Sequence, residues 1–157
     1  MICERVTAEN RDAVNTFIRR QWYTTTMVIR GETVDMTVVE GFFFGEKEDI
    51  QGLITYRISD DILEITYLDS LRENQGIGSA LLERTILEAR ERKCRKVVLI
   101  TTNDNLNALR FYQKRGFDLA RLYRNAVDLA RDKKPEIPLV GDFGIPLHHE
   151  IELEQLI

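Results

Sequence analysis

The sequence predicts a single α/β domain, with a mixed, mostly antiparallel sheet of six or seven strands and helices on both faces. Two observations carry this prediction. Strand patterns at 37–44, 50–58 and 62–68 follow one another across short polar turns, which indicates an antiparallel meander. A long helical pattern and a near-continuous apolar run at 96–102 come next, and strand–helix–strand in this order is typical of a parallel crossover.

The composition is that of an ordinary globular domain. The chain has 157 residues, of which 43% are hydrophobic and 31% charged, so it can bury a core without disulfides or metal. We expect residues 1–157 to form one domain, in the cytoplasm, because no signal-peptide pattern opens the chain. A net charge of −4 argues against a nucleic-acid partner, and no apolar stretch approaches the length of a membrane span.

Metal chemistry has no support in the sequence. The chain has two cysteines, Cys3 and Cys94, and two histidines, His148 and His149. Their spacing matches no known metal-ligand pattern, so we expect no metal cofactor.

Local patterns place the remaining elements. Asn10 precedes a helical pattern that reaches Gln21, and Gly116 stops a later helix. The further elements we expect are a strand at 3–8, an apolar run of undecided state at 27–30, helices at 106–115 and 125–133, a strand at 117–123, a proline-containing loop at 135–146 and a last strand at 150–154.

A glycine-containing turn at 72–82 joins an apolar strand to a long helix that ends near Lys93. Gly76 and Gly78 let the chain turn tightly and let a ligand approach the backbone. The first N–H groups of a helix have no partner within it and lie at the positive end of its dipole, so this junction suits a phosphate. The turn is neither a P-loop, which needs a following Lys, nor a dinucleotide fingerprint, which needs Gly where Leu81 stands.

A second segment identifies the phosphate ligand by resemblance. Residues 105–117 read Asn-Leu-Asn-Ala-Leu-Arg-Phe-Tyr-Gln-Lys-Arg-Gly-Phe, which resembles the Asn-x-x-Ala-x-x-Phe-Tyr-x-x-x-Gly-Phe segment of the GNAT superfamily of acyl-CoA N-acetyltransferases. The glycine turn is similar to the pyrophosphate-binding turn of that family, usually Gln/Arg-x-x-Gly-x-Gly/Ala. The two motifs occur in the family's order, and the resemblance covers about 62–117. Glu73 departs from the pattern at the position of the usual Gln or Arg.

The resemblance implies transfer of an acetyl group from acetyl-CoA to a primary amine of a small molecule or peptide. Leu68 to Ser70, at the end of the strand, would pair their backbone with the pantetheine arm. Asn105 would contact the amides of the cofactor, although a plain helix cap is the alternative. The pyrophosphate would be held by backbone N–H groups of Gln75, Gly76, Ile77, Gly78, Ser79 and Ala80.

Two residues are candidates for proton transfer. Tyr112 falls on the position of the family's tyrosine and would protonate the departing thiolate; its alternative is a ring packed on the apolar face of the helix. Glu64 is our candidate base, a carboxylate in an apolar strand, expected on the face of Thr66 and Leu68 because side chains alternate. An exposed Glu64 with no catalytic role is the alternative, in which case water or a backbone carbonyl relays the proton.

The acceptor and the assembly are less defined. Trp22, Tyr23 and residues 42–44 are candidate walls of an acceptor pocket, and the loop at 135–146 is a candidate cover. A catalytically inactive acyl-CoA sensor is the alternative function. The sequence leaves the oligomeric state open, a homodimer included.

Overall fold

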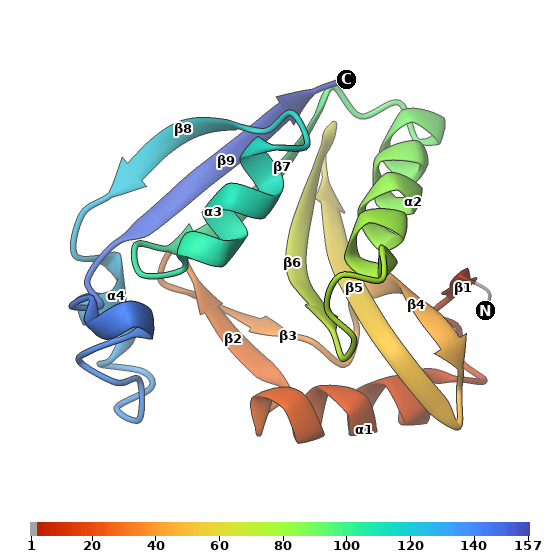
Figure 1. Ribbon diagram of the computed structural model, residues 1–157, viewed down its shortest axis with the longest axis horizontal. Helices are drawn as coiled ribbons and strands as arrows, with labels where there is room; N and C mark the ends of the chain where they lie inside the picture. Colours follow the sequence, from red (N-terminus) through yellow and green to blue (C-terminus); the bar gives the residue numbers. More distant parts are fainter. Residues whose placement is uncertain (1–2) are drawn as a thin grey trace. The chain divides into compact units, whose positions relative to one another are not determined.

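The computed structural model describes residues 3–157, which contain a seven-stranded, mostly antiparallel sheet, a two-stranded sheet and four α-helices (Figure 1). This confirms the predicted fold class. The chain forms two compact units. The first holds the residues up to 27, residues 35–97 and Ile157, and the second holds 28–34 and 98–156. The single-domain organisation stays a prediction, and each unit is described by itself.

The first unit contains the predicted meander. Its strands pair antiparallel in the order β1 (Cys3–Arg5), β4 (Glu40–Glu46), β5 (Asp49–Ser59) and β6 (Ile62–Ser70). The first strand of the meander begins three residues later than the pattern predicted. The Asp35 carboxylate accepts hydrogen bonds from the Thr37 backbone N–H and hydroxyl, at 2.9 and 2.7 Å, and this local turn keeps Thr37 out of the strand.

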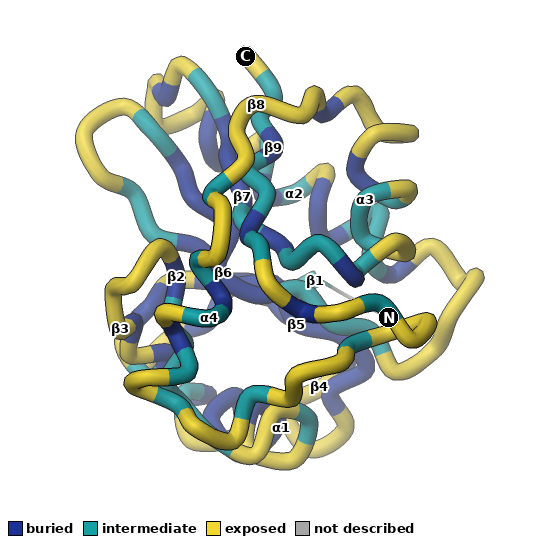
Figure 2. Tube along the Cα trace, turned by 90° about the vertical axis from the view of Figure 1, so that its left-hand side faces the viewer, coloured by how far each residue is buried: buried dark blue, intermediate teal, exposed yellow. Residues whose placement is uncertain are grey.

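Helices cover both faces of this part of the sheet. α2 (Ile77–Glu91) packs on β4, β5 and β6, and α1 (Arg11–Trp22) packs on β5. Leu53 and Ile54 are neighbours on β5 with side chains on opposite faces, and both are 0% exposed. The dark tube of β5 and β6 in Figure 2 shows this burial. The sheet is thus the core of the first unit.

A charged cluster fixes α2 to the first unit. Glu88 of α2 is buried and accepts a hydrogen bond from Arg5 of β1 at 2.7 Å, with Arg84 at 3.3 Å. The guanidinium groups of Arg5 and Arg84 also lie over the Phe42 ring. The hydrogen bond from Arg5 holds the pKa of Glu88 below its ordinary value, against the opposing effect of burial.

The second unit is built on three neighbouring strands. They follow the order β7 (Lys96–Thr102), β9 (Glu150–Leu156) and β8 (Asp118–Tyr123), and β8 pairs antiparallel with β9. β7 begins in the first unit and matches its predicted range. The helices of this unit are α3 (Leu106–Gln113) and the five-residue α4 (Ala126–Ala130), and a 3-10 turn, η1 (Asp142–Gly144), interrupts the predicted loop.

A separate hairpin pairs β2 (Thr26–Ile29) with β3 (Glu32–Asp35). The undecided apolar run at 27–30 is therefore a strand, and the second strand of the hairpin was not predicted. Its turn places Arg30 and Gly31 at φ of 49° and 76°. Two successive positive φ values are the requirement of a tight two-residue hairpin turn, and only the glycine signals it in the sequence.

Among residues 3–157, no helix is long and apolar enough to cross a membrane. The same residues contain no group of three or more His, Cys, Asp or Glu side chains placed to hold a metal ion.

Candidate functional site

The turn between β6 and α2 is an exposed backbone loop. Residues 71–76 are all exposed, and Asn74 and Gly76 have φ of 61° and 76°. A Cβ at Gly76 would meet nothing within 4 Å. Glycine is therefore favoured at this position by the left-handed backbone conformation, and not by a lack of space for a side chain. The space around Gly76 is open to a ligand. The off-pattern Glu73 is exposed as well.

The N-terminus of α2 has no side-chain cap among the described residues. Its first intrahelical bond runs from the Ala80 N–H to the Gly76 carbonyl, 2.9 Å apart. The predicted pyrophosphate residues Gln75 to Ala80 thus form one continuous segment across the helix start. An uncapped, exposed helix start is a suitable site for an anion, because its N–H groups carry the positive end of the dipole.

A glycine on β5 sets the distance between that helix start and the sheet. A Cβ at Gly52 would lie 2.6 Å from Ile77 Cγ2 and 3.2 Å from Leu81 Cδ1. The first turn of α2 therefore rests directly on the β5 backbone. No local pattern reveals this contact, because Gly52 and Ile77 belong to different elements.

A bulge interrupts β6 in the middle of the strand. Thr55 of β5 pairs with Tyr67, but the next residue, Tyr56, pairs with Ile65. Thr66 is therefore an extra residue on β6, and its hydroxyl is hydrogen-bonded to that of Thr55 at 2.8 Å. Bulges of this kind redirect side chains and occur often next to functional sites.

The bulge corrects one expectation for Glu64. Ile54 pairs with Leu68, and Arg57 pairs with Glu64. Paired residues share a face, whereas Ile54 and Arg57, three residues apart, lie on opposite faces. Glu64 and Leu68 are therefore on opposite faces of the sheet. The predicted shared face was wrong, because strict alternation does not hold across the extra residue.

Glu64 is buried and already has a cationic partner. Glu64 is only 5% exposed. Its Oε1 lies 2.8 Å from Nε of Arg57, the residue that pairs with it on β5. The exposed alternative is thus excluded by the structure. A general base must reach the proton that it removes. One oxygen of the Glu64 carboxylate already accepts a charged hydrogen bond from the Arg57 guanidinium, which argues against that role.

The end of β6 carries a polar pair that the sequence analysis missed. Leu68 and Ser70, the predicted pantetheine partners, are both half-buried there. Between them, Asp69 accepts hydrogen bonds from the Tyr67 hydroxyl at 3.0 Å and from the Ser70 N–H at 2.8 Å. The signal available in the sequence was the Tyr-x-Asp spacing, which puts two side chains on one face of a strand.

In the second unit, Asn105 caps α3. Its side-chain oxygen accepts a hydrogen bond from the Ala108 N–H at 3.2 Å. The cap uses only the carbonyl oxygen, and within residues 3–157 the side-chain nitrogen has no hydrogen-bond partner. Capping and a contact to a ligand amide are therefore compatible in the same side chain.

Tyr112 lies in an aromatic cluster of the second unit. It is 6% exposed and meets the rings of Phe111 and Phe117 edge to face, with centroids 5.1 and 5.4 Å apart. Burial raises the pKa of Tyr112 above its ordinary value. The phenol therefore keeps its proton at neutral pH, as a donor must.

The candidate acceptor walls differ in exposure. Phe42 and Phe43 are core residues of the first unit, so they are not pocket walls. Trp22 is part of α1 and Tyr23 follows it at a φ of 65°, and both are exposed.

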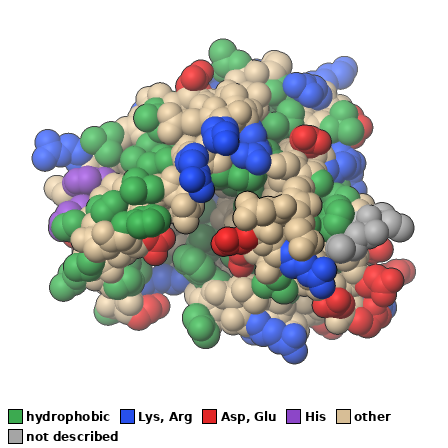
Figure 3. All heavy atoms as spheres, in the orientation of Figure 1, with side chains coloured by type: hydrophobic (Ala, Val, Ile, Leu, Met, Phe, Trp, Pro, Cys, Tyr) green, Lys and Arg blue, Asp and Glu red, His purple; other side chains and the backbone are tan. Residues whose placement is uncertain are grey.

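Side chains of the second unit anchor the predicted cover loop. The buried Asp104 carboxylate accepts a hydrogen bond from the Asp142 N–H at 2.9 Å, and Arg131 donates to the carbonyls of Pro138 and Leu147. His148 is exposed, and its Nδ1 is paired with Asp128. In Figure 3 hydrophobic side chains lie beside the two histidines, and the exposed apolar residues of this loop are Leu139, Val140 and Phe143.

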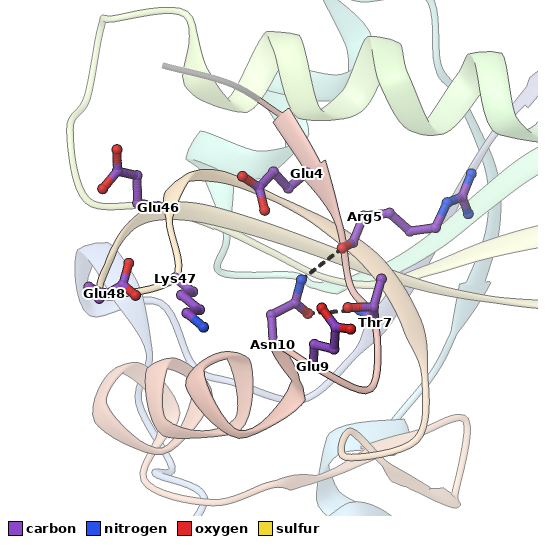
Figure 4. A pocket seen from close by; sticks show the side chains of 8 residues that line it. All are labelled: Glu4, Arg5, Thr7, Glu9, Asn10, Glu46, Lys47 and Glu48. Atoms are coloured by element: carbon purple, nitrogen blue, oxygen red, sulfur yellow. Dashed lines mark hydrogen bonds between the residues drawn. The ribbon is translucent and has the colours of Figure 1, made fainter.

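A separate open hollow lies at one corner of the first unit (Figure 4). Its lining is charged and polar, and the Arg5 side chain points away from the others. No predicted site residue borders it. The residues that line it are Glu4, Arg5, Thr7, Glu9, Asn10, Glu46, Lys47 and Glu48.

Comparison with known proteins decides the family. The model of the acetyltransferase (GNAT) family matches residues 7–117. The chain belongs to the GNAT family. The uncharacterized protein YxbD of Bacillus subtilis strain 168 is 46% identical to it over 144 residues, 91% of each chain.

Two solved structures share the fold of this GNAT chain. A GNAT family acetyltransferase from Elizabethkingia anophelis, with acetyl-CoA bound, has a TM-score of 0.70 at 22% identity and covers 99% of this chain and 97% of its own. An acetyltransferase from Bacillus subtilis in complex with CoA has a TM-score of 0.66 at 14% identity, covering 99% of each chain. These two structures show the fold, and the family match shows that the chain belongs to the acetyltransferase (GNAT) family.

Proposed function

We propose that this acetyltransferase transfers the acetyl group of acetyl-CoA to a primary amine of a small molecule or peptide. The observation that carries the proposal is the uncapped start of α2, which follows an exposed turn with Gly76 in the left-handed region. That geometry suits a pyrophosphate, and acetyl-CoA is the acyl donor of the family and is bound in the Elizabethkingia anophelis relative.

Each part of the chain has a proposed task. Backbone N–H groups of residues 75–80 hold the pyrophosphate, the backbone of Leu68 and Ser70 pairs with the pantetheine arm, and the Asn105 side-chain nitrogen contacts the cofactor. Tyr112, on the position of the family's tyrosine, protonates the departing thiolate, and the phenol carries its proton at neutral pH. Glu64 is the base that the sequence predicts, and its 2.8 Å ion pair with Arg57 argues against that role.

Two measurements test the proposal. Calorimetry should show binding of CoA and of acetyl-CoA, and a thiol-release assay should show turnover with at least one of spermidine, kanamycin and an alanine-initiated peptide. Binding without any turnover would indicate the acyl-CoA sensor. Absence of binding would contradict the function altogether.

Tyr112→Phe tests the acid. Loss of the phenol proton should lower kcat about 100-fold, a typical contribution of a general acid, with the dissociation constant of acetyl-CoA unchanged. Phe111→Leu is the matched control, because it disturbs the same aromatic cluster without removing a proton donor. A kcat of Tyr112→Phe equal to that of the unsubstituted protein would remove Tyr112 from the mechanism.

A further inference from the structure

The face of β6 opposite Leu68 gathers three polar side chains of the first unit. Arg57 pairs with Glu64, and Thr55 pairs with Tyr67. Thr55 and Arg57 are two residues apart on β5, so Glu64 and Tyr67 share a face, and Asp69 follows on that face two residues later. The extra residue at the bulge is what places Glu64 on the face that Tyr67 and Asp69 share.

The two carboxylates on this face have different surroundings. Glu64 is buried against the Arg57 guanidinium at 2.8 Å. Asp69 is half-buried at the strand end and has no salt-bridge partner within residues 3–157. Its hydrogen-bond donors are the neutral Tyr67 hydroxyl and the Ser70 N–H. A carboxylate has about four lone-pair positions, so Asp69 retains acceptor capacity for a further donor.

Tyr67 is held as a proton donor to Asp69. Its ring is buried, and its hydroxyl lies 3.0 Å from Asp69 Oδ2. Burial and then the negative charge of Asp69 raise the pKa of Tyr67, so the phenol stays protonated. The hydrogen bond from the Tyr67 hydroxyl therefore fixes the orientation of the Asp69 carboxylate.

We propose that Asp69 is a catalytic residue that binds the ammonium group of the acceptor and removes its proton, with Tyr67 as its positioning residue. The proposal rests on the proposed function, because Asp69 lies between Leu68 and Ser70, the residues assigned to the pantetheine arm. The one anionic group at this strand end that lacks a cationic partner in the described chain fits a cation. A primary alkylamine, the acceptor class of the proposed function, is charged at neutral pH and is such a cation.

The protons and electrons of the proposed step balance. The Asp69 carboxylate takes one proton from R–NH3+, leaving R–NH2. The nitrogen lone pair attacks the thioester carbon, the C–N bond forms, the C–S bond breaks, and its electron pair leaves on sulfur. Tyr112 supplies the proton of the resulting CoA thiol. The amide nitrogen loses its second proton to water, and water also restores the tyrosine proton and removes the one on Asp69.

The test is a pH profile of kcat/KM for Asp69→Asn, measured with whichever of spermidine, kanamycin and the alanine-initiated peptide turns over fastest. We expect a loss of about 100-fold at pH 7, the size of a typical general-base contribution. The loss should shrink as pH rises, because the fraction of neutral amine grows and needs no base. A rate within threefold of the unsubstituted protein at pH 7 would overturn the assignment, as would a tenfold or larger loss in Glu64→Gln beside an active Asp69→Asn.

Tyr67→Phe tests the positioning role. Removing a donor from the ionised carboxylate should move the acidic limb of the profile to higher pH, an effect that packing alone does not produce. An unmoved limb would exclude Tyr67. Asp118→Asn, an exposed carboxylate on β8, is the control and should match the unsubstituted protein. Calorimetry separates the two levels: unchanged acetyl-CoA binding with lost pH dependence concerns Asp69, whereas no binding by the unsubstituted protein defeats the proposed function.

Discussion

Two of the strand-to-helix junctions, β6 to α2 and β7 to α3, differ in how the first N–H groups of the helix are paired. At the first, Gly76 leaves the start of α2 without a side-chain cap among the described residues. At the second, Asn105 caps α3, while the Asn103 and Asp104 side chains bind the backbone at His148, His149 and Asp142.

At the first junction the N–H groups of the helix start are left available for a ligand, whereas at the second a side chain of the same unit accepts a hydrogen bond from one of them. An uncapped start retains free positive potential, which an anion can use. A capped start gives up one N–H to its own side chain and gains stability of about 1 kcal/mol. A substitution at the first junction should therefore damage ligand binding, whereas loss of the capping oxygen at the second should cost stability alone. Four predictions, ordered by their expected effect on the free energy of unfolding, test this contrast.

Gly52→Val should have the largest effect. Its side chain would collide with Ile77 Cγ2, at 2.6 Å from the first added carbon, and push the first turn of α2 away from β5. Overpacking of this kind lowers the free energy of unfolding by about 1–3 kcal/mol. Thermal unfolding and acetyl-CoA calorimetry should both change. If acetyl-CoA binding by Gly52→Val stays normal, the position of α2 does not determine the phosphate-binding geometry of the turn before it.

Glu88→Gln should rank second in stability. The lost charged hydrogen bond to Arg5 is expected to lower the free energy of unfolding by about 2 kcal/mol at pH 7. Because Arg5 lowers the pKa of Glu88 in the folded state, the stabilisation is present above the unfolded pKa of about 4.3 and is lost as pH falls through the folded value. Denaturant unfolding from pH 7 to pH 2 should therefore show the two proteins converging in acid. A constant difference would mean that the carboxylate charge is not responsible.

Gly76→Ala should come third for folding and should weaken ligand binding. The substitution meets no atom within 4 Å, so its cost is the left-handed backbone, about 1–2 kcal/mol, together with a methyl group on the phosphate-facing surface. Gly76→Asn is the control for strain, because asparagine tolerates this conformation better. If both variants bind acetyl-CoA like the unsubstituted protein, close approach of the ligand to Gly76 is excluded.

The pair Asn105→Ala and Asn105→Asp should have the smallest effect and the most specific one. Alanine removes the cap and should lower the free energy of unfolding by about 1 kcal/mol. Aspartate keeps a capping oxygen but removes the side-chain N–H donors. We expect aspartate to preserve stability and to weaken acetyl-CoA binding. Unchanged binding in both variants would leave Asn105 as a helix cap only.

The fold was largely predictable because its signals are local. The antiparallel meander, the run at 96–102 and the long helix follow from side-chain periods that any short window displays. The β2–β3 hairpin was less predictable, because Arg30 adopts a positive φ and arginine is not a residue type that favours one. At the candidate site, the backbone conformation that the structure shows at Gly76, with a φ of 76°, is the feature that the sequence indicates directly, because glycine records a backbone requirement.

By itself, the sequence determined the order of the elements, the glycine turn and the two motifs that place this chain in the GNAT family. Tertiary structure decided which of the carboxylates Glu64 and Asp69 has a cationic partner within residues 3–157. One extra residue at Thr66 reverses the side-chain alternation of β6 and so places Glu64 on the face of Tyr67 and Asp69. On that face Glu64 is paired with Arg57, and Asp69 accepts a hydrogen bond from Tyr67. A bulge arises from pairing between strands, and no single strand carries its signature, so the face of each later side chain is fixed only when the partner strand is in place.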